Sequence, residues 1–358
     1  MTRVAVVRTS PQTIQDDYQR LFALAGLAEA LPPGEPLALK LNLSWSRYFP
    51  AASTPPWQLE AVLRALFKAG HRPDALIAVE TRTAYVNPRR ALKANRLEHL
   101  LTAHGIRFVG LGRAERMPYR SKRPLLVLDR LYPDGVPVPT VMYGRNVVHL
   151  ATLKTHGLCT LTGAIKNGWG AVLPPLTHHL HKYIQEVLVD LLALQLQLHP
   201  HRFAVLDGTV CGDGAGPRTM QPRIQNYLIA GSDLLAVDAT AARLMGFDPL
   251  SIPHMALAHA LGLGCGDPDH IEIVGDDISQ VNFGFRSQIN LALWGDQVLV
   301  RGPFRVLERL LLHSRFHALV PVLSALYHDV LWYNLVGRPR LTQFLRSDWG
   351  RVFLSYSP

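Results

Sequence analysis

The sequence predicts an α/β fold in which a mostly parallel sheet carries helices on both faces. Short apolar runs typical of buried strands alternate with longer segments whose apolar residues recur at helical spacing. Prolines and glycines separate these segments, as at residues 32–34 and at Gly70. Hydrophobic residues make up 48% of the 358-residue chain and charged residues 18%, which is enough apolar material for a sizeable core. This alternation favours parallel strands joined by crossover helices.

The elements can be placed in order along the chain. Strands are expected at residues 3–8, 36–43, 75–80, 106–110, 146–153, 203–207, 225–231 and 271–275. Helices are expected at residues 13–30, from 53–54 to 70, and at 88–105, 183–198 and 234–246. Pro55 near the start of the second helix and Asp233 just before the last are helix-start signals, because proline suits the first turn and an aspartate can cap free N–H groups.

Two segments depart from this pattern and set the predicted domain division. Residues 1–300 form the α/β domain, in which the basic insertion at 113–140 is expected to hold a hairpin or an edge strand, or else to present a surface for an anionic ligand. Residues 301–358 form a C-terminal helical tail rich in arginine and aromatic residues. The tail could pack on the domain, form a dimer interface, or lie on an anionic membrane surface through residues 303–358.

Charge and cysteine content limit the function classes. The net charge of +10 concentrates in residues 113–130 and in the tail, and no basic recognition helix or RNA-binding signature is found, so nucleic acid is a disfavoured partner. Cys159, Cys211 and Cys265 lie about fifty residues apart, which excludes an iron–sulfur motif and favours a reducing compartment. The apolar stretch near the N-terminus is too short for a signal peptide, so we expect a cytoplasmic protein, with contact to the inner face of the membrane left open.

Residues 153–182 carry most of the candidate chemistry. This stretch follows a strand and combines four glycines with lysines, threonines and histidines. Glycines let backbone N–H groups approach a ligand, lysines complement anions, and histidines move protons or bind metal. A loop at the carboxyl end of a parallel strand lies where open α/β sheets bind ligands. The candidate catalytic residues are His156, Lys166, Lys154 and Asp213, the last from a glycine-rich turn at residues 213–217.

Further polar residues are expected to complete the site. Several follow other strand ends, and Asp238 is either paired inside a helix or facing the ligand, because an unpaired buried carboxylate is costly. The candidate substrate- or cofactor-binding residues are Lys40, Asn42, Glu80, Thr162, Gly163, Asn167, Asp207, Gly214, Gly216 and Asp238. The candidate metal ligands are His178, His179 and His181, of which only the first and last would share a helix face.

With these motifs assembled, residues 36–276 resemble the family catalogued as domain of unknown function 362. The resemblance rests on K-x-N-L at 40–43, K-x-H…T-G-x-x-K-N…G at 154–170, D-G…G-x-G-P at 207–217, G-x-D…A-x-D…M-G at 231–246 and G-L-G at 262–264. Many members of that family carry a ferredoxin-like segment with cysteine-rich iron–sulfur motifs. This sequence has none, which implies no intrinsic iron–sulfur cluster and leaves electron transfer to a separate redox partner.

A local similarity links the same loop to the nickel-pincer-dependent lactate racemase family. There a histidine precedes, by ten residues, a lysine within a T-G-G-x-K loop, and His156 and Lys166 have that separation. Ala164 stands where the family has its second glycine. The similarity implies His156 as acid/base, Lys166 as cofactor anchor and one of the three clustered histidines as metal ligand.

The leading hypothesis is an enzyme that acts on a small or lipid-like anionic substrate through the Lys/His/Gly-rich loop. Its reaction class stays open between isomerase- or racemase-like and redox chemistry. The alternative is a metal- or cofactor-binding accessory protein or electron-transfer partner. The cofactor would be a divalent metal or a nickel-pincer-like group, and a homo-oligomer is compatible with either hypothesis.

Overall fold

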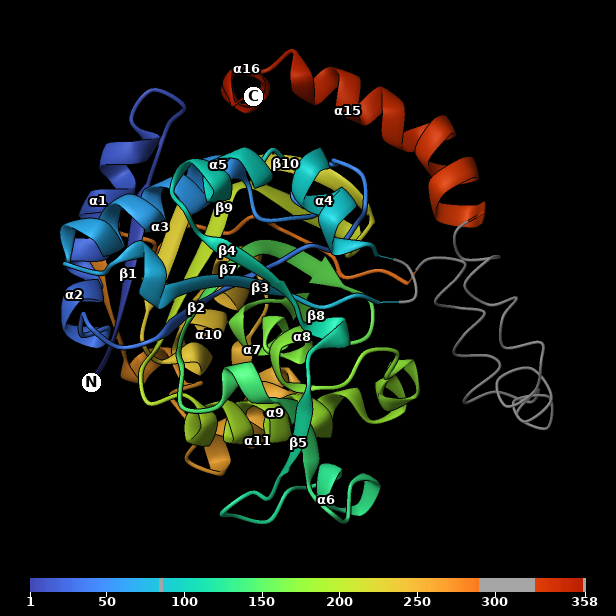
Figure 1. Cartoon of the computed structure of the whole chain (residues 1–358). Helices are drawn as coiled ribbons and strands as arrows, with labels where there is room; N and C mark the ends of the chain where they lie inside the picture. Colours follow the sequence, from blue (N-terminus) through green and yellow to red (C-terminus); the bar gives the residue numbers. More distant parts are fainter. Residues whose placement is uncertain (84–85, 290–325, 357–358) are drawn as a thin grey trace.

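The computed structural model describes residues 1–83, 86–289 and 326–356, and within them a nine-stranded, mostly parallel sheet forms the centre of the molecule (Figure 1). Eight strands lie in the order β11-β1-β10-β9-β7-β2-β3-β4, and β8 pairs with β7 outside this path. Only β10 runs antiparallel to both neighbours in the path. The strands are β1 (Thr2–Arg8), β2 (Leu37–Leu41), β3 (Leu76–Glu80), β4 (Arg107–Gly110), β7 (Asn146–His156), β8 (Thr160–Thr162), β9 (Arg202–Ala215), β10 (Thr219–Gly231) and β11 (Ile271–Gly275).

Helices cover both faces of this sheet, which confirms the predicted fold class (Figure 1). The first face holds α1 (Ile14–Leu24), α2 (Leu27–Ala30), α3 (Pro56–Lys68), α4 (Pro88–Ala94), α5 (Glu98–Ala103), α15 (Arg338–Leu345) and α16 (Asp348–Ser355). The second face holds α6 (Leu128–Leu131), α7 (Ala164–Asn167), α8 (Trp169–Val172), α9 (Ile184–Leu198), α10 (Leu234–Met245) and α11 (Pro253–Ala260).

The strands contribute side chains to two hydrophobic cores, one on each face of the sheet, because successive side chains of a strand point to opposite faces. In β2, Leu37, Leu39 and Leu41 pack under the first face, whereas Ala38 packs under the second. Lys40 therefore shares the face of Ala38, beside α7 and α8. This alternation is what directs a charged side chain of a fully buried strand towards the glycine-rich loop.

Two predicted helices are each divided in the structure. The helix expected at residues 13–30 is interrupted at Gly26, whose φ of +66° is left-handed. The helix expected at 88–105 is interrupted at Arg96, with φ of +58°. A left-handed residue ends a run of helical hydrogen bonds, so each periodic segment becomes two shorter helices.

Strands β7, β9 and β10 are several residues longer than the sequence predicts, and β10 begins at Thr219 and not at residue 225. Strand β7 extends through His156 and pairs with β8, so Lys154 and His156 lie in a strand pair and not in a loop. Strand β9 extends to Ala215 and forms a long hairpin with β10, so the expected glycine-rich turn at 213–217 belongs mostly to that hairpin. The sequence did not predict these extensions, because their glycines and polar residues are not typical of a buried strand.

The basic insertion holds the expected hairpin. Strands β5 (Arg116–Tyr119) and β6 (Val136–Pro139) pair antiparallel in a separate two-stranded sheet. Arg116 donates hydrogen bonds to the carbonyls of Pro137 at 2.7 Å and of Val172, the last residue of α8, at 3.2 Å, so it connects the insertion to the end of α8.

The described part of the C-terminal tail packs on the first face of the sheet. Phe344, Trp349 and Phe353 are buried there, and the Phe353 ring stacks on Tyr48 with 3.6 Å between centroids. Trp349 Nε1 donates to Asn226 Oδ1 at 2.7 Å. The predicted boundary at residue 301 lies outside the described residues. None of the described helices is long and apolar enough to cross a bilayer.

Candidate functional site

Polar side chains from three parallel strands meet at their carboxyl ends. Lys40 lies near the end of β2, Glu80 ends β3, Lys154 lies near the end of β7, and Asn42 follows β2. Because these strands are adjacent and parallel, their ends share one edge of the sheet. The sequence placed these residues at separate strand ends, and the structure brings them into one hydrogen-bonded group.

Lys40 and Glu80 form a buried ion pair at 2.9 Å, with side chains only 2% and 7% exposed. Burial lowers the pKa of Lys40, and the carboxylate of Glu80 opposes that effect. Glu80 also accepts the backbone N–H groups of Leu43 at 3.0 Å and Thr81 at 2.7 Å. A Cβ on Gly170 would lie 2.8 Å from Glu80 Oε1, so only glycine lets α8 approach the pair this closely.

Lys154 is fully buried, and its hydrogen-bond partners among the described residues are all neutral. Its Nζ donates to Asn42 Oδ1, to the carbonyl of Ala52 at 2.9 Å and to Thr152 Oγ1 at 2.8 Å. Burial and then the charge of Lys166 hold the pKa of Lys154 well below its usual value. A buried ammonium that is hydrogen-bonded but has no counter-ion is costly, and an anionic ligand would offset that cost.

Asn167 ties the glycine-rich loop to this group. Its Oδ1 accepts from Lys40 Nζ at 3.3 Å and from Asn42 Nδ2 at 3.4 Å, while its Nδ2 donates to the Lys40 carbonyl at 3.1 Å. Since Asn167 ends α7, these bonds fix the position of the short helix that carries Lys166.

Asp238 holds the start of α7 and faces the loop backbone. Its two carboxylate oxygens accept the N–H groups of Ala164 at 2.6 Å and Ile165 at 3.0 Å. A Cβ on Gly163 would lie 2.1 Å from Asp238 Oδ1, so glycine is required there. Burial raises the pKa of Asp238 to about 7 despite these bonds. Of the two readings of Asp238 from sequence, the structure has the paired one.

Lys166 and His156 complete the centre of the site. The Lys166 ammonium lies over the Trp169 ring, 5.6 Å from its centroid, and desolvation lowers its pKa. His156 Nδ1 accepts the N–H of Leu158 at 3.2 Å, which assigns the proton of the neutral ring to Nε2. Burial, and then Lys166, hold the pKa of His156 well below its usual value, so the imidazole is neutral at pH 7.

Two predicted carboxylates have other partners. Asp207 accepts hydrogen bonds from Tyr18 Oη at 2.7 Å and Trp57 Nε1 at 2.8 Å, which ties β9 to α1 and α3. Asp213 forms an ion pair with Arg223 at 2.9 Å and accepts the N–H of Arg286 at 2.9 Å. Their hydrogen bonds hold the frame together and do not reach the lysines.

The remaining predicted residues line or support the loop. Gly216 touches the carbonyl of Thr155, where a Cβ would lie only 1.9 Å away, and Gly214 has φ of +97°. These glycines let the β9–β10 hairpin approach the end of β7. Thr162 Oγ1 is buried and has no hydrogen-bond partner among the described residues.

The histidine cluster lies in a helical turn that precedes α9. The His181 ring packs 4.9 Å from the Trp169 ring, on the tryptophan that also carries Lys166, and His179 is exposed. The His178 side chain lies outside the described ones. Among described side chains, no group of three His, Cys, Asp or Glu residues is placed to hold a metal ion. The metal site, and the pincer-type cofactor that the local similarity implies, stay predictions.

Sequence reasoning missed three groups that shape the site. Trp169 carries no obvious ligand chemistry in sequence, yet it contacts both Lys166 and His181. Thr152 sits in an apolar strand and binds Lys154. His254, at the start of an apolar helix, bonds to Gln185 through Nδ1 at 2.8 Å. In the sequence, only the position directly after Pro253 distinguishes this histidine, and the apolar periodicity gives no information about it.

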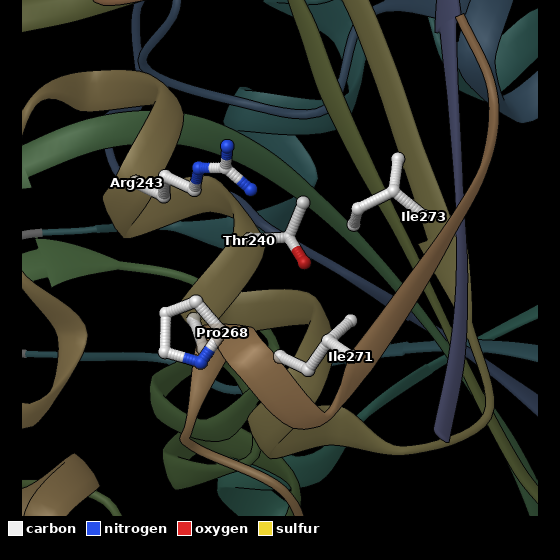
Figure 2. Close-up of a pocket in the computed structure, with 6 residues that line it drawn as sticks. Thr240, Arg243, Pro268, Ile271 and Ile273 are labelled. Carbon is white, nitrogen blue, oxygen red and sulfur yellow. The ribbon is translucent and has the colours of Figure 1, made fainter. Parts of the chain in front are cut away.

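A separate pocket opens beside the edge of the sheet. Figure 2 shows Thr240 and Arg243 of α10 facing Pro268 and the β11 residues Ile271 and Ile273. None of the predicted site residues lines it.

The fold and the site together define an α/β protein with a buried, lysine-rich polar centre at the carboxyl ends of parallel strands. The chain belongs to the family described as domain of unknown function (DUF362), whose model matches residues 37–243. It is also similar to the Thylakoid-associated protein sll1697 of Synechocystis sp., with 28% identity over 251 residues, which cover 68% of this chain and 73% of that protein.

Proposed function

We propose that the protein is an enzyme whose lysine-rich centre binds a small or lipid-like anionic substrate. The observation that carries the proposal is the imbalance of charge. Lys40, Lys154 and Lys166 influence one another electrostatically, and Glu80 is the carboxylate paired with one of them. An anion bound beside Lys154 and Lys166 would restore the balance in a low-dielectric site, where such an interaction is strong.

His156 is the residue that would move protons in this enzyme. Its ring is neutral at pH 7, and Nε2 has no hydrogen-bond partner among the described residues. A neutral imidazole accepts a proton from one position of the substrate and returns it to another or to water. A bound anion would offset the positive field of Lys166, which depresses the pKa of His156, and so would make proton capture easier.

Thermal unfolding in the presence of probe anions tests this assignment. Inorganic phosphate, pyruvate and dodecanoate would be titrated against the wild-type protein and the variants Lys154→Met and Lys93→Met. Lys93 is exposed on α4 and serves as the matched control. We expect at least one anion to raise Tm of wild type and of Lys93→Met, and to lose at least about tenfold in affinity in Lys154→Met. An equal effect on all three proteins, or no effect of any probe, would refute the proposal.

A second proposal concerns location: we propose that the protein binds the surface of an anionic membrane. The segment η8 (Leu326–Gly337) has π-helical hydrogen bonding and four exposed apolar side chains. The last three lie four, five and nine residues after the first, which places all four on one face of such a helix. These are Leu326, Val330, Leu331 and Leu335. Exposed Arg47 and Arg338 lie beside this segment, with Arg47 over the Tyr333 ring. The name of the cyanobacterial relative also supports a membrane location.

Vesicle sedimentation tests the location. Wild type should sediment with phosphatidylglycerol vesicles and not with phosphatidylcholine vesicles, and less so at high salt. The double variant Leu331→Glu/Leu335→Glu should bind at least about tenfold more weakly, because two leucine side chains would no longer enter the interface. Leu250→Glu, at an exposed leucine after α10, is the control. Sedimentation of the double variant equal to wild type, or no sedimentation of wild type, would refute it.

A further inference from the structure

The ring of His156 is oriented by the turn that follows it. His156 ends β7, residues 157–159 form the turn, and β8 begins at Thr160. Leu158 in this turn donates its N–H to His156 Nδ1 at 3.2 Å. In a neutral imidazole the ring nitrogen that accepts a hydrogen bond carries no proton, so the proton lies on Nε2. The position of Leu158 therefore decides which nitrogen of His156 is protonated.

This turn is held from outside by Gln185, near the start of α9. Thr160 has φ of +68°, a left-handed conformation that is uncommon for a β-branched residue and needs support from its surroundings. Gln185 Nε2 donates to the Leu158 carbonyl at 3.0 Å. Leu158 is thus bound by Gln185 at its carbonyl, and it binds His156 through its N–H.

The side-chain amide of Gln185 can have one orientation only. Its Oε1 lies 3.2 Å from the backbone nitrogen of His254 and 2.8 Å from the Nδ1 atom of the same residue, at the start of α11. A backbone N–H is a donor and a backbone carbonyl is an acceptor, so the amide oxygen must face His254 and the amide nitrogen must face Leu158. His254 Nδ1 therefore carries a proton and donates it to Gln185. A flipped amide would place donor against donor and acceptor against acceptor.

We infer that Gln185 is a positioning residue that holds His156 in the tautomer with the proton on Nε2. His156 keeps 5% exposure, and Nε2 is its ring nitrogen without a hydrogen-bond partner among the described residues. This inference rests on the proposed function, because it assigns what His156 first offers to the bound anion, a hydrogen bond from Nε2 to an anion oxygen. The ring takes up a proton only when the Leu158 N–H has left Nδ1.

Nuclear magnetic resonance of the histidine rings tests the inference. The full-length protein would be labelled with ¹⁵N in its histidine rings, and the His156 signals would be assigned at pH 7 by their loss in His156→Gln. We expect wild type to show one tautomer, protonated at Nε2. Gln185→Met has neither amide group, so the two His156 nitrogen signals should move towards each other as the ring exchanges between tautomers.

Gln197→Met is the matched control on the same helix. Gln197 also has one donor and one acceptor contact, to Ser121 Oγ at 2.9 Å and from the N–H of Lys122 at 2.7 Å. This variant should leave the His156 tautomer as in wild type, although it too loses two hydrogen bonds. A change of the same size in both variants would mean that general loosening of α9 moves the ring, and would overturn the inference.

Two further results would also overturn it: a wild-type ring protonated at Nδ1, or a tautomer that is unchanged in Gln185→Met. Gln185→Asn replaces that variant if it fails to fold, because the side chain is one methylene too short to reach both His254 and Leu158, and the same change is expected. If probe anions raise Tm but the tautomer does not depend on Gln185, anion binding stands and only this inference is lost. If the tautomer depends on Gln185 but no anion binds, the proposed function is lost and the positioning of the ring stands.

Discussion

At the scale of residues, the centre is dominated by charges removed from water. Removing one partner of a buried ion pair leaves an uncompensated charge, whereas removing both together costs much less. Lys40 and Glu80 are the clearest case, because their side chains are almost fully buried and Glu80 also binds two backbone N–H groups.

A double-mutant cycle measures this pair. Glu80→Gln should lower the free energy of unfolding by about 3 kcal/mol, because Lys40 would keep a charge with no counter-ion. Lys40→Met/Glu80→Gln should lose less than Glu80→Gln alone. Urea unfolding of the wild type, the two single variants and the double variant gives the coupling energy, which we expect to exceed about 1 kcal/mol. Additive losses would show that the two side chains do not interact.

The buried histidine His254 should make stability depend on pH. Burial lowers its pKa to about 4, against about 6.5 in the unfolded chain. The folded protein therefore binds fewer protons than the unfolded chain between these values. His254 contributes about 3 kcal/mol that is fully present above pH 6.5 and is lost as pH falls to 4.

Urea unfolding at pH 7 and pH 4.5 checks this dependence. Burial also lowers the pKa of His199 to about 4, so the comparison is between wild type and His254→Asn, which keeps a hydrogen-bond donor for Gln185. The variant should lose less stability than wild type on acidification. His270→Asn, at an exposed histidine, should behave as wild type. An identical pH response in His254→Asn would contradict the prediction.

At the scale of elements, the site depends on how α7 begins. A helix of four residues cannot stabilise itself, so its position comes from Asp238 at its first N–H groups and from Asn167 at its end. The helix therefore holds Lys166 over the ring of Trp169 in α8.

Gly163→Ala should disturb the position of α7. The new Cβ would overlap the Asp238 carboxylate, which would have to leave two buried N–H groups unsatisfied, at a cost of about 2–4 kcal/mol. Gly110→Ala is the matched control, since φ there is −80° and no atom lies within 4 Å of the added Cβ. We expect that control to change the free energy of unfolding by less than about 0.5 kcal/mol. Equal losses in the two variants would contradict the assigned role of Gly163.

The elements also show where prediction from sequence stops. The strand ends could be predicted from the apolar runs, and so the sequence placed Lys40, Asn42 and Glu80 at the carboxyl ends of strands, where the structure has them. The sequence could not predict which groups the Asp207 and Asp238 carboxylates bind. An aspartate in a glycine-rich motif has the same appearance whether it binds a ligand or accepts hydrogen bonds from other parts of the protein. The partners that decide it, Tyr18 and Trp57 for Asp207, lie over a hundred residues away in the chain.

At the scale of the whole molecule, the C-terminal helices are part of the first hydrophobic core. Trp349 is 1% exposed and packs against Trp57 of α3, with 5.2 Å between ring centroids. The composition of the tail could not distinguish this packing from an interfacial role, since both place aromatic and arginine residues at helical spacing. The structure shows that α15 and α16 pack on the core. A role at the membrane interface stays a proposal, which rests on the exposed apolar face of η8.

Trp349→Ala tests the contribution of these helices. Removal of a buried indole should lower the free energy of unfolding by about 3–5 kcal/mol, because the cavity cannot close fully. Leu335→Ala, at a side chain that is 74% exposed, should change it by less than about 0.5 kcal/mol. Chemical unfolding of both variants measures the difference. Similar values would mean that the tail does not stabilise the core.

The strand order has a further consequence for biosynthesis. Strand β1 is translated before every other described element, yet its neighbours are β10 and β11, and Thr2 pairs with Ile271. Strand β1 therefore has no partner strand until nearly the whole described sheet has been translated, and Val4 to Val7 are exposed until then. A chain with this order has a high contact order, so slow maturation and dependence on chaperones during synthesis are expected of this protein.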